Sequence, residues 1–247
     1  ENSLHTVSPD GRHVVFNSKA SNLSVDGNAG WNIYLRDLQT NTTSQVNLKA
    51  DGYSLNSSGP NDIYKITDDF RYIFFDSHYD GITAYDIETG TTERLDVHTD
   101  GTYGNDNRYH TSFTDISPDG RYVAFGSRST NLVDNDGAGV DNSFNLFLRD
   151  RETGTTQPIS VGSDGNLADS SSGYGSMTSD GRYVVFDSVS NLVAEDTNGA
   201  VQDVFLRDMV NGTTERISVG TDGTQGNFNS FDPAVSLDGR YVAFTSS

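Results

Sequence analysis

The sequence predicts an all-β fold assembled from repeated four-stranded units, and three observations carry this prediction. The first is a turn signature, Asp-Gly-Arg or a degenerate copy of it, which occurs at Asp10–Arg12, Asp69–Arg71, Asp119–Arg121, Asp180–Arg182 and Asp238–Arg240. The second is its spacing, because successive copies start 50 to 61 residues apart, as in repeat architectures. The third is a composition rich in Gly, Ser, Thr, Asn, Tyr and Phe, without capped helical periodicity. Together they predict a β-propeller of four-stranded antiparallel blades.

Each repeat contains four strand-like runs, named A to D. Strand A leads into the Asp-Gly turn and is expected at Leu4–Ser8, Ile63–Thr67, Phe113–Ser117, Gly175–Thr178 and Pro233–Ser236. Strand B follows that turn and is expected at His13–Phe16, Tyr72–Phe75, Tyr122–Phe125, Tyr183–Phe186 and Tyr241–Phe244. The B runs are almost entirely β-branched or aromatic, as in strands that are buried on both faces.

The outer half of each repeat is more polar. Strand C precedes an Asp, in most copies as part of an Arg-Asp pair, and is expected at Asn32–Leu35, Ile82–Tyr85, Asn145–Leu148 and Val204–Leu206. Strand D follows a Gly/Asn turn and is expected at Ser44–Leu48, Thr92–Val97, Thr156–Val161 and Thr214–Val219. The mixed character of strand D suits the outer edge of a blade.

The number of runs predicts a single propeller domain over residues 1–247, with four complete blades and the first two strands of a fifth. Three explanations of the fifth repeat stay open. The sequence is part of a longer chain, or five repeats close into a ring with one thin blade, or the last blade is completed by another chain in a homo-oligomer or larger assembly. An open repeat stack exposes a sheet edge, which proteins normally cover.

Two strings carry a resemblance to a known family. The string Ser-Pro-Asp-Gly-Arg-Tyr-Val-Ala-Phe at Ser117–Phe125 resembles the TolB-type repeat, a bacterial relative of the WD-type blade. The string at Asn191–Asp208 resembles a subgroup common in secreted bacterial proteins. The resemblance covers the whole chain and implies a bacterial protein of the periplasm, cell surface or extracellular space. Propellers of this type serve as binding platforms, as accessory domains and as enzymes, so the resemblance leaves the function open.

The charge balance excludes some partners. Lys and Arg number 16 and Asp and Glu 35, which gives a formal net charge of −19. Such a surface repels nucleic acid and anionic membranes and favours cations or basic partners, although it would also serve solubility alone. No apolar run is long enough for membrane insertion. The absence of cysteine excludes disulfides, thiol catalysis and Cys-based zinc sites.

Strand alternation predicts where a site would lie. The A–B and C–D turns fall at one end of each blade, and the longer, acidic B–C and D–A loops fall at the other. Function is usually carried by variable loops on a rigid scaffold. The end that bears the B–C and D–A loops is therefore the expected functional face.

The B–C loops resemble calcium loops, because Asp and Asn oxygens alternate ahead of a Gly. The predicted ligands, with Ca²⁺ as the cofactor, are Asp196, Asn198 and Asp203 in the fourth repeat, Asp134, Asp136 and Asp141 in the third, and Asp26 and Asn28 in the first. Calcium takes six to eight hard oxygen ligands, and Gly lets the backbone fold round the ion. The alternative is an ordinary Asx turn, in which the side chain bonds the local backbone.

Aromatic residues follow the Asp-Gly turns of the D–A loops. The predicted ligand-binding set is Tyr53, Tyr103, Tyr109, His110, Tyr174 and Phe228. Aromatic and Asn/Asp side chains together suit a glycan or peptide partner. The alternative is packing between blades, which we expect for Phe231. The Asp-Gly pairs themselves are expected to be turns with φ > 0.

The repeated charged residues are expected to be structural. The pairs Arg36-Asp37, Arg149-Asp150 and Arg207-Asp208 recur at equal phase, so Asp should accept turn amides and Arg should bond carbonyls or stack on Tyr. The arginines of the Asp-Gly-Arg turns are expected to behave in the same way.

Catalytic motifs are sparse, because the sequence has neither a His-Glu-x-x-His nor a Gly-x-Ser-x-Gly string. The minority hypothesis is a glycan-active enzyme, glycosidase- or lyase-like, that uses the channel carboxylates Asp62, Asp115 and Asp232. The preferred interpretation is a non-catalytic binding or structural propeller whose acidic loops hold calcium and contact a glycan or a protein. A third interpretation is a structural segment of a larger assembly.

Overall fold

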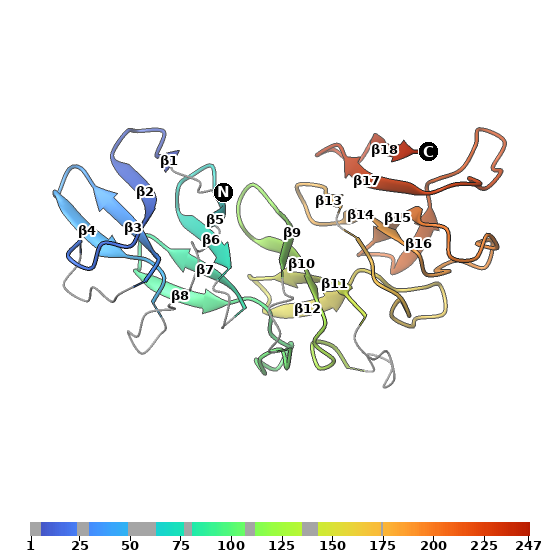
Figure 1. Ribbon diagram of the computed structural model, residues 1–247, viewed down its shortest axis with the longest axis horizontal. Helices are drawn as coiled ribbons and strands as arrows, with labels where there is room; N and C mark the ends of the chain where they lie inside the picture. Colours follow the sequence, from blue (N-terminus) through green and yellow to red (C-terminus); the bar gives the residue numbers. More distant parts are fainter. Residues whose placement is uncertain are drawn as a thin grey trace. The chain divides into compact units, whose positions relative to one another are not determined.

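The computed structural model describes residues 6–23, 30–48, 63–76, 81–106, 112–134, 143–173 and 175–247. The chain divides into two compact units, Glu1–Leu95 and Asp96–Ser247, and each is described by itself (Figure 1). Every regular element in the described part of the chain is a β-strand. A search of the same residues finds no helix with the length and apolar character needed to cross a membrane.

The first unit consists of two four-stranded antiparallel sheets. Blade 1 contains β1 (Thr6–Val7), β2 (His13–Ser18), β3 (Asn32–Asp37) and β4 (Thr42–Gln45). Blade 2 contains β5 (Ile63–Ile66), β6 (Tyr72–Asp76), β7 (Ile82–Asp86) and β8 (Thr91–Arg94). In both sheets the strands pair in sequence order, each with the next, as expected for runs A to D.

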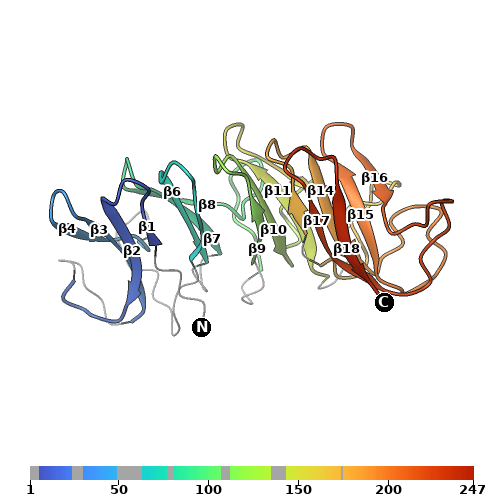
Figure 2. The same cartoon turned by 90° about the horizontal axis from the view of Figure 1, so that it is seen from above.

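The second unit contains three sheets, which lie side by side in Figures 1 and 2. Blade 3 contains β9 (Ser112–Ile116), β10 (Tyr122–Ser127), β11 (Asn145–Asp150) and β12 (Thr155–Pro158). Blade 4 contains β13 (Ser176–Met177), β14 (Tyr183–Ser188), β15 (Asp203–Asp208) and β16 (Thr213–Arg216). Blade 5 contains β17 (Ser230–Val235) and β18 (Val242–Ser246). The predicted fold class, with four four-stranded blades and two strands of a fifth, is confirmed.

The predicted bounds of the D strands were wrong by a few residues. Each D strand starts at the first Thr after the turn and ends sooner than expected, as β4 does at Gln45. The next residue, Val46, still donates its N–H to the Ile33 carbonyl at 2.8 Å, but its side chain is fully buried. The regular ladder ends there because the Ile33 N–H donates to the Asn47 side-chain oxygen at 3.0 Å instead of to a backbone carbonyl, a substitution that alternation along the strand does not reveal.

The core of each unit comes mainly from strands B and C. In the second unit Phe125 stacks on Phe147 and Phe186 packs on Phe205, with ring centroids 5.7 and 5.8 Å apart. All four rings are almost completely buried. The expectation that strand B is covered on both faces therefore holds for β10 and β14. It was wrong for β18, where four of the five residues are exposed, Phe244 among them, because no described strand pairs with the far side of β18.

One side-chain contact of the D strands recurs in both units. On the D strands, Thr156 Oγ1 donates to the Val97 carbonyl at 2.5 Å and Thr214 Oγ1 donates to the Val161 carbonyl at 2.6 Å. In the first unit Thr92 Oγ1 donates to the Leu48 carbonyl at 2.9 Å. The second Thr of the Thr-Thr pair therefore fastens its D strand to the start of the D–A loop that precedes its own blade, within one unit.

Candidate functional site

The turn end of the blades has the structural role expected of it. Asp208 accepts hydrogen bonds from the Val210 and Asn211 N–H groups at 2.9 and 3.1 Å, and Arg207 donates to the Gly212 carbonyl at 3.0 Å. Arg182 Nη2 lies 3.0 Å from Asp208 Oδ2, and its guanidinium stacks over Tyr183 at 4.7 Å. The same contacts recur in blades 1 and 3, so the structural interpretation of the Arg-Asp pairs is confirmed.

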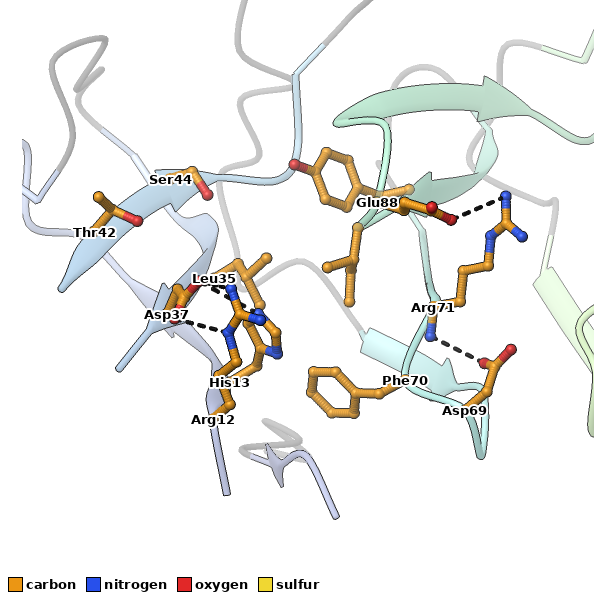
Figure 3. A pocket seen from close by; sticks show the side chains of 12 residues that line it. Arg12, His13, Leu35, Asp37, Thr42, Ser44, Asp69, Phe70, Arg71 and Glu88 are labelled. Carbon is orange, nitrogen blue, oxygen red and sulfur yellow. Dashed lines mark hydrogen bonds and ion pairs between the residues drawn. The ribbon is translucent and has the colours of Figure 1, made fainter. Parts of the chain in front are cut away.

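A cleft of about 640 Å³ opens at the turn end between blades 1 and 2 (Figure 3). Its charged groups are paired with one another: Arg12 binds Asp37 at 2.6 Å, and Arg71 contacts Glu88 at 3.7 Å. The His13 and Phe70 rings stack across it, with centroids 5.9 Å apart. Since its charges are internally satisfied, this cleft is a joint of the scaffold.

The equivalent joint between blades 3 and 4 is smaller, about 220 Å³. There the large ring is Tyr122, at the position of His13, and Gly181 stands at the position of Phe70. A Cβ at Gly181 would lie 2.5 Å from Tyr122 Cγ, so the ring rests directly on the glycine. In the first joint both blades contribute a ring, His13 from blade 1 and Phe70 from blade 2. In the second joint only blade 3 contributes a ring, that of Tyr122, and it packs on Gly181 of blade 4.

The opposite end of the second unit carries the B–C and D–A loops, which side chains fasten to each other. Before blade 3, Asn105 donates its Nδ2 to Thr130 Oγ1 at 2.9 Å and accepts the Thr130 N–H at 2.9 Å. Asn131 accepts the Asn105 N–H and donates to the Tyr103 carbonyl, both at 2.9 Å. The loops therefore form a defined surface.

The same fastening joins blade 4 to the loop before blade 5. Gln225 Nε2 donates to Asp196 Oδ1 at 2.9 Å, and the Gln202 N–H donates to Asn229 Oδ1 at 3.1 Å. Gly101, Gly165 and Gly223, the described glycines of the Asp-Gly turns, have φ between 82° and 89°, which confirms the predicted turn conformation.

The structure brings together the three ligands predicted in the fourth repeat. Asn198 Nδ2 donates to Asp203 Oδ2 at 3.0 Å, and the Asn198 Oδ1 atom is buried without a hydrogen-bond partner among the described residues. Burial, and then the charge of Asp203, raise the pKa of Asp196. Two buried carboxylates and a buried, unpaired amide oxygen thus meet beneath this loop.

A cation of the protein itself enters this loop. Arg216 Nη1 lies 3.3 Å from Asp196 Oδ1, and both side chains are nearly buried. The remaining carboxylate, Asp203, accepts from the Ser218 hydroxyl at 2.5 Å. Sequence reasoning missed Arg216 because it lies on β16, 20 residues beyond Asp196, and only the tertiary fold brings it to the loop.

The other predicted calcium ligands are not gathered in the described part of the chain. Asp134 is exposed, and its Oδ1 lies 3.5 Å from His98 Nε2. Asp26, Asn28, Asp136 and Asp141 lie outside the described residues. Within the described ranges, no group of three or more His, Asp or Glu side chains is arranged to hold a metal.

The carboxylates of the minority enzyme hypothesis differ in their surroundings. Asp115 accepts hydrogen bonds from the Ile116 and Met177 N–H groups at 2.7 and 2.9 Å, and so links blade 3 to blade 4. Ser176 makes the corresponding link to Val235 at 2.7 Å. Asp232 is exposed, and Asp62 lies outside the described residues.

A carboxyl group that sequence reasoning missed lies next to Asp232. Asp187, at the end of β14, is buried, and its pKa is raised by burial and, more weakly, by the charge of Asp232. It accepts from Gln202 Nε2 at 2.6 Å and from the Asp232 N–H at 3.3 Å. Asp232 has φ of 52°, a left-handed conformation unusual for Asp, at an irregularity of β17. The sequence signal that could have identified Asp187 is its position directly after the apolar run Tyr183–Phe186.

The predicted aromatic surface is only partly described. Tyr103 and Phe228 are each 60% exposed on D–A loops of the second unit. Tyr53, Tyr109, His110 and Tyr174 lie outside the described residues. Two of the six predicted aromatic side chains are thus placed, and both face solvent.

Comparison with known proteins adds evidence on the fold. No protein-family model matches the sequence, and no curated protein matches it significantly. Among solved structures, the putative TolB from Agrobacterium tumefaciens is 21% identical, with a TM-score of 0.43, over 100% of this chain and 74% of that one. The hydrazine synthase of Kuenenia stuttgartiensis is 16% identical, with a TM-score of 0.45, over 97% of this chain and 60% of that one.

A third solved structure is that of an oligogalacturonate lyase in complex with manganese. It is 14% identical with a TM-score of 0.51, and the match covers 98% of this chain and 57% of the lyase chain. At this identity the likeness shows the β-propeller fold alone. The four-stranded blades and this likeness show the β-propeller fold, and the resemblance to TolB-type repeats rests on the sequence motifs.

Proposed function

We propose that the protein is a non-catalytic binding propeller whose acidic loop end contacts a protein or a glycan. The observation that carries this proposal is the fastening of the B–C loops to the D–A loops, through Asn105, Gln202 and Gln225. A preformed surface loses little conformational entropy on binding. Loops held in this way on a stack of sheets suit recognition.

The exposed groups of this end are those that recognition uses. Tyr103 and Phe228 offer aromatic faces, to which sugar rings and apolar side chains bind. The net charge of −19 favours a basic protein over nucleic acid or an anionic membrane. The test is a glycan array and a protein-binding screen with Tyr103→Ala, Phe228→Ala and, as control, Leu237→Ala, an equally exposed side chain at the turn end.

Loss of a saturable interaction in the two loop-end variants, and its retention in Leu237→Ala, supports the proposal. Binding that survives both loop-end substitutions, or that falls equally in all three variants, contradicts it. Calcium and chelator are compared in every assay, so that a metal-dependent interaction is recognised.

We further propose that the loop carrying Asp196, Asn198 and Asp203 binds Ca²⁺. The support is the convergence of these oxygens, including the unpaired Asn198 Oδ1. Oxygen ligands of this kind are those that calcium prefers. Because Arg216 already contacts Asp196, the ion would be held chiefly beside Asp203, and Asn198 would turn its amide oxygen toward it.

The calcium proposal is tested by titrating Ca²⁺ into chelated protein while the melting temperature is measured. The melting temperature of the wild type should rise as Ca²⁺ binds, and that of Asn198→Ala should stay constant. Asn227→Ala, an exposed Asn of the neighbouring loop, is the matched control. No shift at millimolar calcium would refute calcium binding by this loop.

A glycan-active enzyme is the second candidate, and the Asp187–Asp232 pair favours it. A buried carboxyl group with a raised pKa beside an exposed carboxylate is a recognised signature of acid–base sites. Oligogalacturonate and other polysaccharides are the substrates to test. Turnover that disappears in both Asp187→Asn and Asp232→Asn would establish this candidate, whereas the absence of turnover in wild type would exclude it for those substrates.

The proposed location is the bacterial periplasm, cell surface or extracellular space, and the proposed partners include a larger assembly or a second copy of the chain. The support is the secreted-type motif at Asn191–Asp208. Cell fractionation with an antibody against the protein tests the location, and cross-linking in the same cells tests the assembly.

A further inference from the structure

A cleft of about 400 Å³ lies on the loop end of blade 4, between the D–A loop that precedes the blade and its B–C loop. Its floor is apolar: Ala168 and Leu192 are nearly buried, and Leu167 and Val189 are half-buried. Asp164 and Asp169 line its exposed rim. The described lining contains no Lys, Arg, His or aromatic residue.

The same two loops are closed onto each other in blade 3, which shows why the cleft is open in blade 4. Ser129 and Ser190 occupy equivalent positions, since each donates its N–H to a Ser two residues earlier at 3.1 Å. Each also accepts, through its hydroxyl oxygen, an N–H from the facing loop, at 3.0 Å from Asp106 and 2.9 Å from Ser170. The two loop pairs can therefore be aligned residue by residue.

Two sequence differences remove the closure. Blade 3 has Ser-Thr-Asn-Leu at Ser129–Leu132, whereas blade 4 has Ser-Asn-Leu at Ser190–Leu192, so Thr130 has no counterpart. In addition, Asp169 stands at the position of Asn105, which is the residue that binds Thr130 through both its donor and its acceptor. Blade 4 therefore loses both halves of this fastening.

The consequence is a pair of polar side chains left for an outside partner. Neither the Asp169 carboxylate nor the Asn191 amide hydrogen-bonds or ion-pairs with another described residue. The D–A loop remains in place nonetheless, because the Ser163 N–H donates to the Leu192 carbonyl at 2.8 Å. The second rim carboxylate, Asp164, accepts hydrogen bonds from the Asn166 N–H at 3.0 Å and from Asn166 Nδ2 at 2.8 Å, and the backbone bond lowers its pKa.

We propose that this blade-4 cleft receives a lysine or arginine side chain of a partner protein. The apolar floor suits the aliphatic stem of such a side chain, and the Asp164 and Asp169 carboxylates suit its charged end. The cleft is much larger than a bare ion needs, and its described lining lacks the aromatic surface on which sugars stack. The net charge of −19 also attracts basic partners to the surface.

This inference rests on the proposed binding role of the loop end, and it names the chemistry of one contact there. The probes are three peptides of the form acetyl-Gly-X-Gly-amide, where X is lysine, arginine or norleucine. Norleucine keeps the aliphatic stem and lacks the charge. Binding is followed through the backbone amide resonances of Ala168, Asn191 and Leu192 in ¹⁵N–¹H spectra of the full chain.

Wild type should show saturable shifts of these resonances with the lysine and arginine peptides and not with norleucine. Asp169→Asn should weaken binding about tenfold, the effect of one charge-assisted contact. Glu215→Gln removes the same charge from the exposed edge strand β16 and should bind as wild type does. A second variant combines Asp169→Asn with a Thr inserted between Ser190 and Asn191, which restores the blade-3 fastening and should abolish binding.

Three results would overturn the proposal: no saturable shift, equal binding of the norleucine peptide, or an undiminished affinity in Asp169→Asn. A methyl glycoside that shifts these resonances while the lysine peptide does not would also overturn it, in favour of a sugar. Retained lysine-peptide binding alongside a failed glycan and protein screen would refute the broader function and leave the cleft assignment standing. A successful glycan or protein screen without lysine-peptide binding would refute the cleft assignment and leave the broader function standing.

Discussion

Replacing Gly181 by Ala tests whether the Tyr–Gly joint determines how blades 3 and 4 pack. Gly181 has φ of 68°, and a Cβ added there would lie 2.5 to 2.8 Å from three ring atoms of Tyr122. The left-handed conformation costs an alanine about 1–2 kcal/mol, and overpacking against a ring held between two blades adds about 1–3 kcal/mol. We therefore expect a loss of about 2–5 kcal/mol in the free energy of unfolding from these two contributions.

Gly165→Ala is the matched control, because Gly165 has φ of 83° and a Cβ there would meet nothing within 4 Å. It should show the conformational cost alone. Both variants are measured by urea denaturation, with the slope checked so that the midpoints can be compared. The double variant Tyr122→His/Gly181→Ala should recover most of the difference, since blade 1 has His13 at the ring position. Equal losses in Gly165→Ala and Gly181→Ala would refute the proposed role of the joint.

Three further predictions concern charges and fasteners. The hydrogen bond from Arg182 lowers the pKa of Asp208 from its ordinary 3.8 to about 2, so the stability it contributes is complete above about pH 4 and is lost as the pH falls toward 2. Acid titration followed by circular dichroism should therefore show a smaller loss of stability over this interval in Asp208→Asn than in wild type, and an identical profile would contradict the linkage. Arg216→Met should lower the free energy of unfolding by about 3 kcal/mol, because it leaves Asp196 buried without its cation. Adding Asp196→Asn should restore part of this loss, as measured by thermal unfolding, and a double variant no more stable than Arg216→Met would argue against the ion pair. Thr156→Val should lower the free energy of unfolding by about 1–3 kcal/mol, because the Val97 carbonyl and Arg149 both lose a hydrogen-bond partner. Thr43→Val is the control, since among the described residues the Thr43 hydroxyl accepts only from Arg36; an equal loss in the two variants would show that the fastener is unimportant.

The sequence alone was enough to predict the blades. The Asp-Gly-Arg turns predicted the phase of every repeat, and the run from Tyr122 to Phe125 predicted a buried inner strand. The roles of Arg207 and Asp208 also followed from recurrence, because a residue that returns at the same phase with the same neighbours belongs to the scaffold.

The candidate site was less predictable. The proximity of Asp196, Asn198 and Asp203, the predicted calcium ligands, followed from local spacing, since all three lie within eight residues. Arg216 was not found, because its contact with Asp196 depends on the pairing of β15 with β16. Asp187 was missed for a related reason: its burial and its contact with Asp232 arise between two sheets.

Local sequence determined the elements of this protein because strand alternation, turn residues and repeat phase act over a few neighbouring positions. The chain therefore carried its fold class, its blade order and its structural charges in the sequence itself. Only the tertiary structure decided which loops close. The pairs Asn105–Thr130 and Asp169–Asn191 look alike as strings of polar residues, yet the first fastens its loops and the second leaves a cleft. The difference arises from one missing Thr in the B–C loop and one Asn-to-Asp replacement in the D–A loop. These two loops meet only after folding, so the effect of the two changes depends on packing.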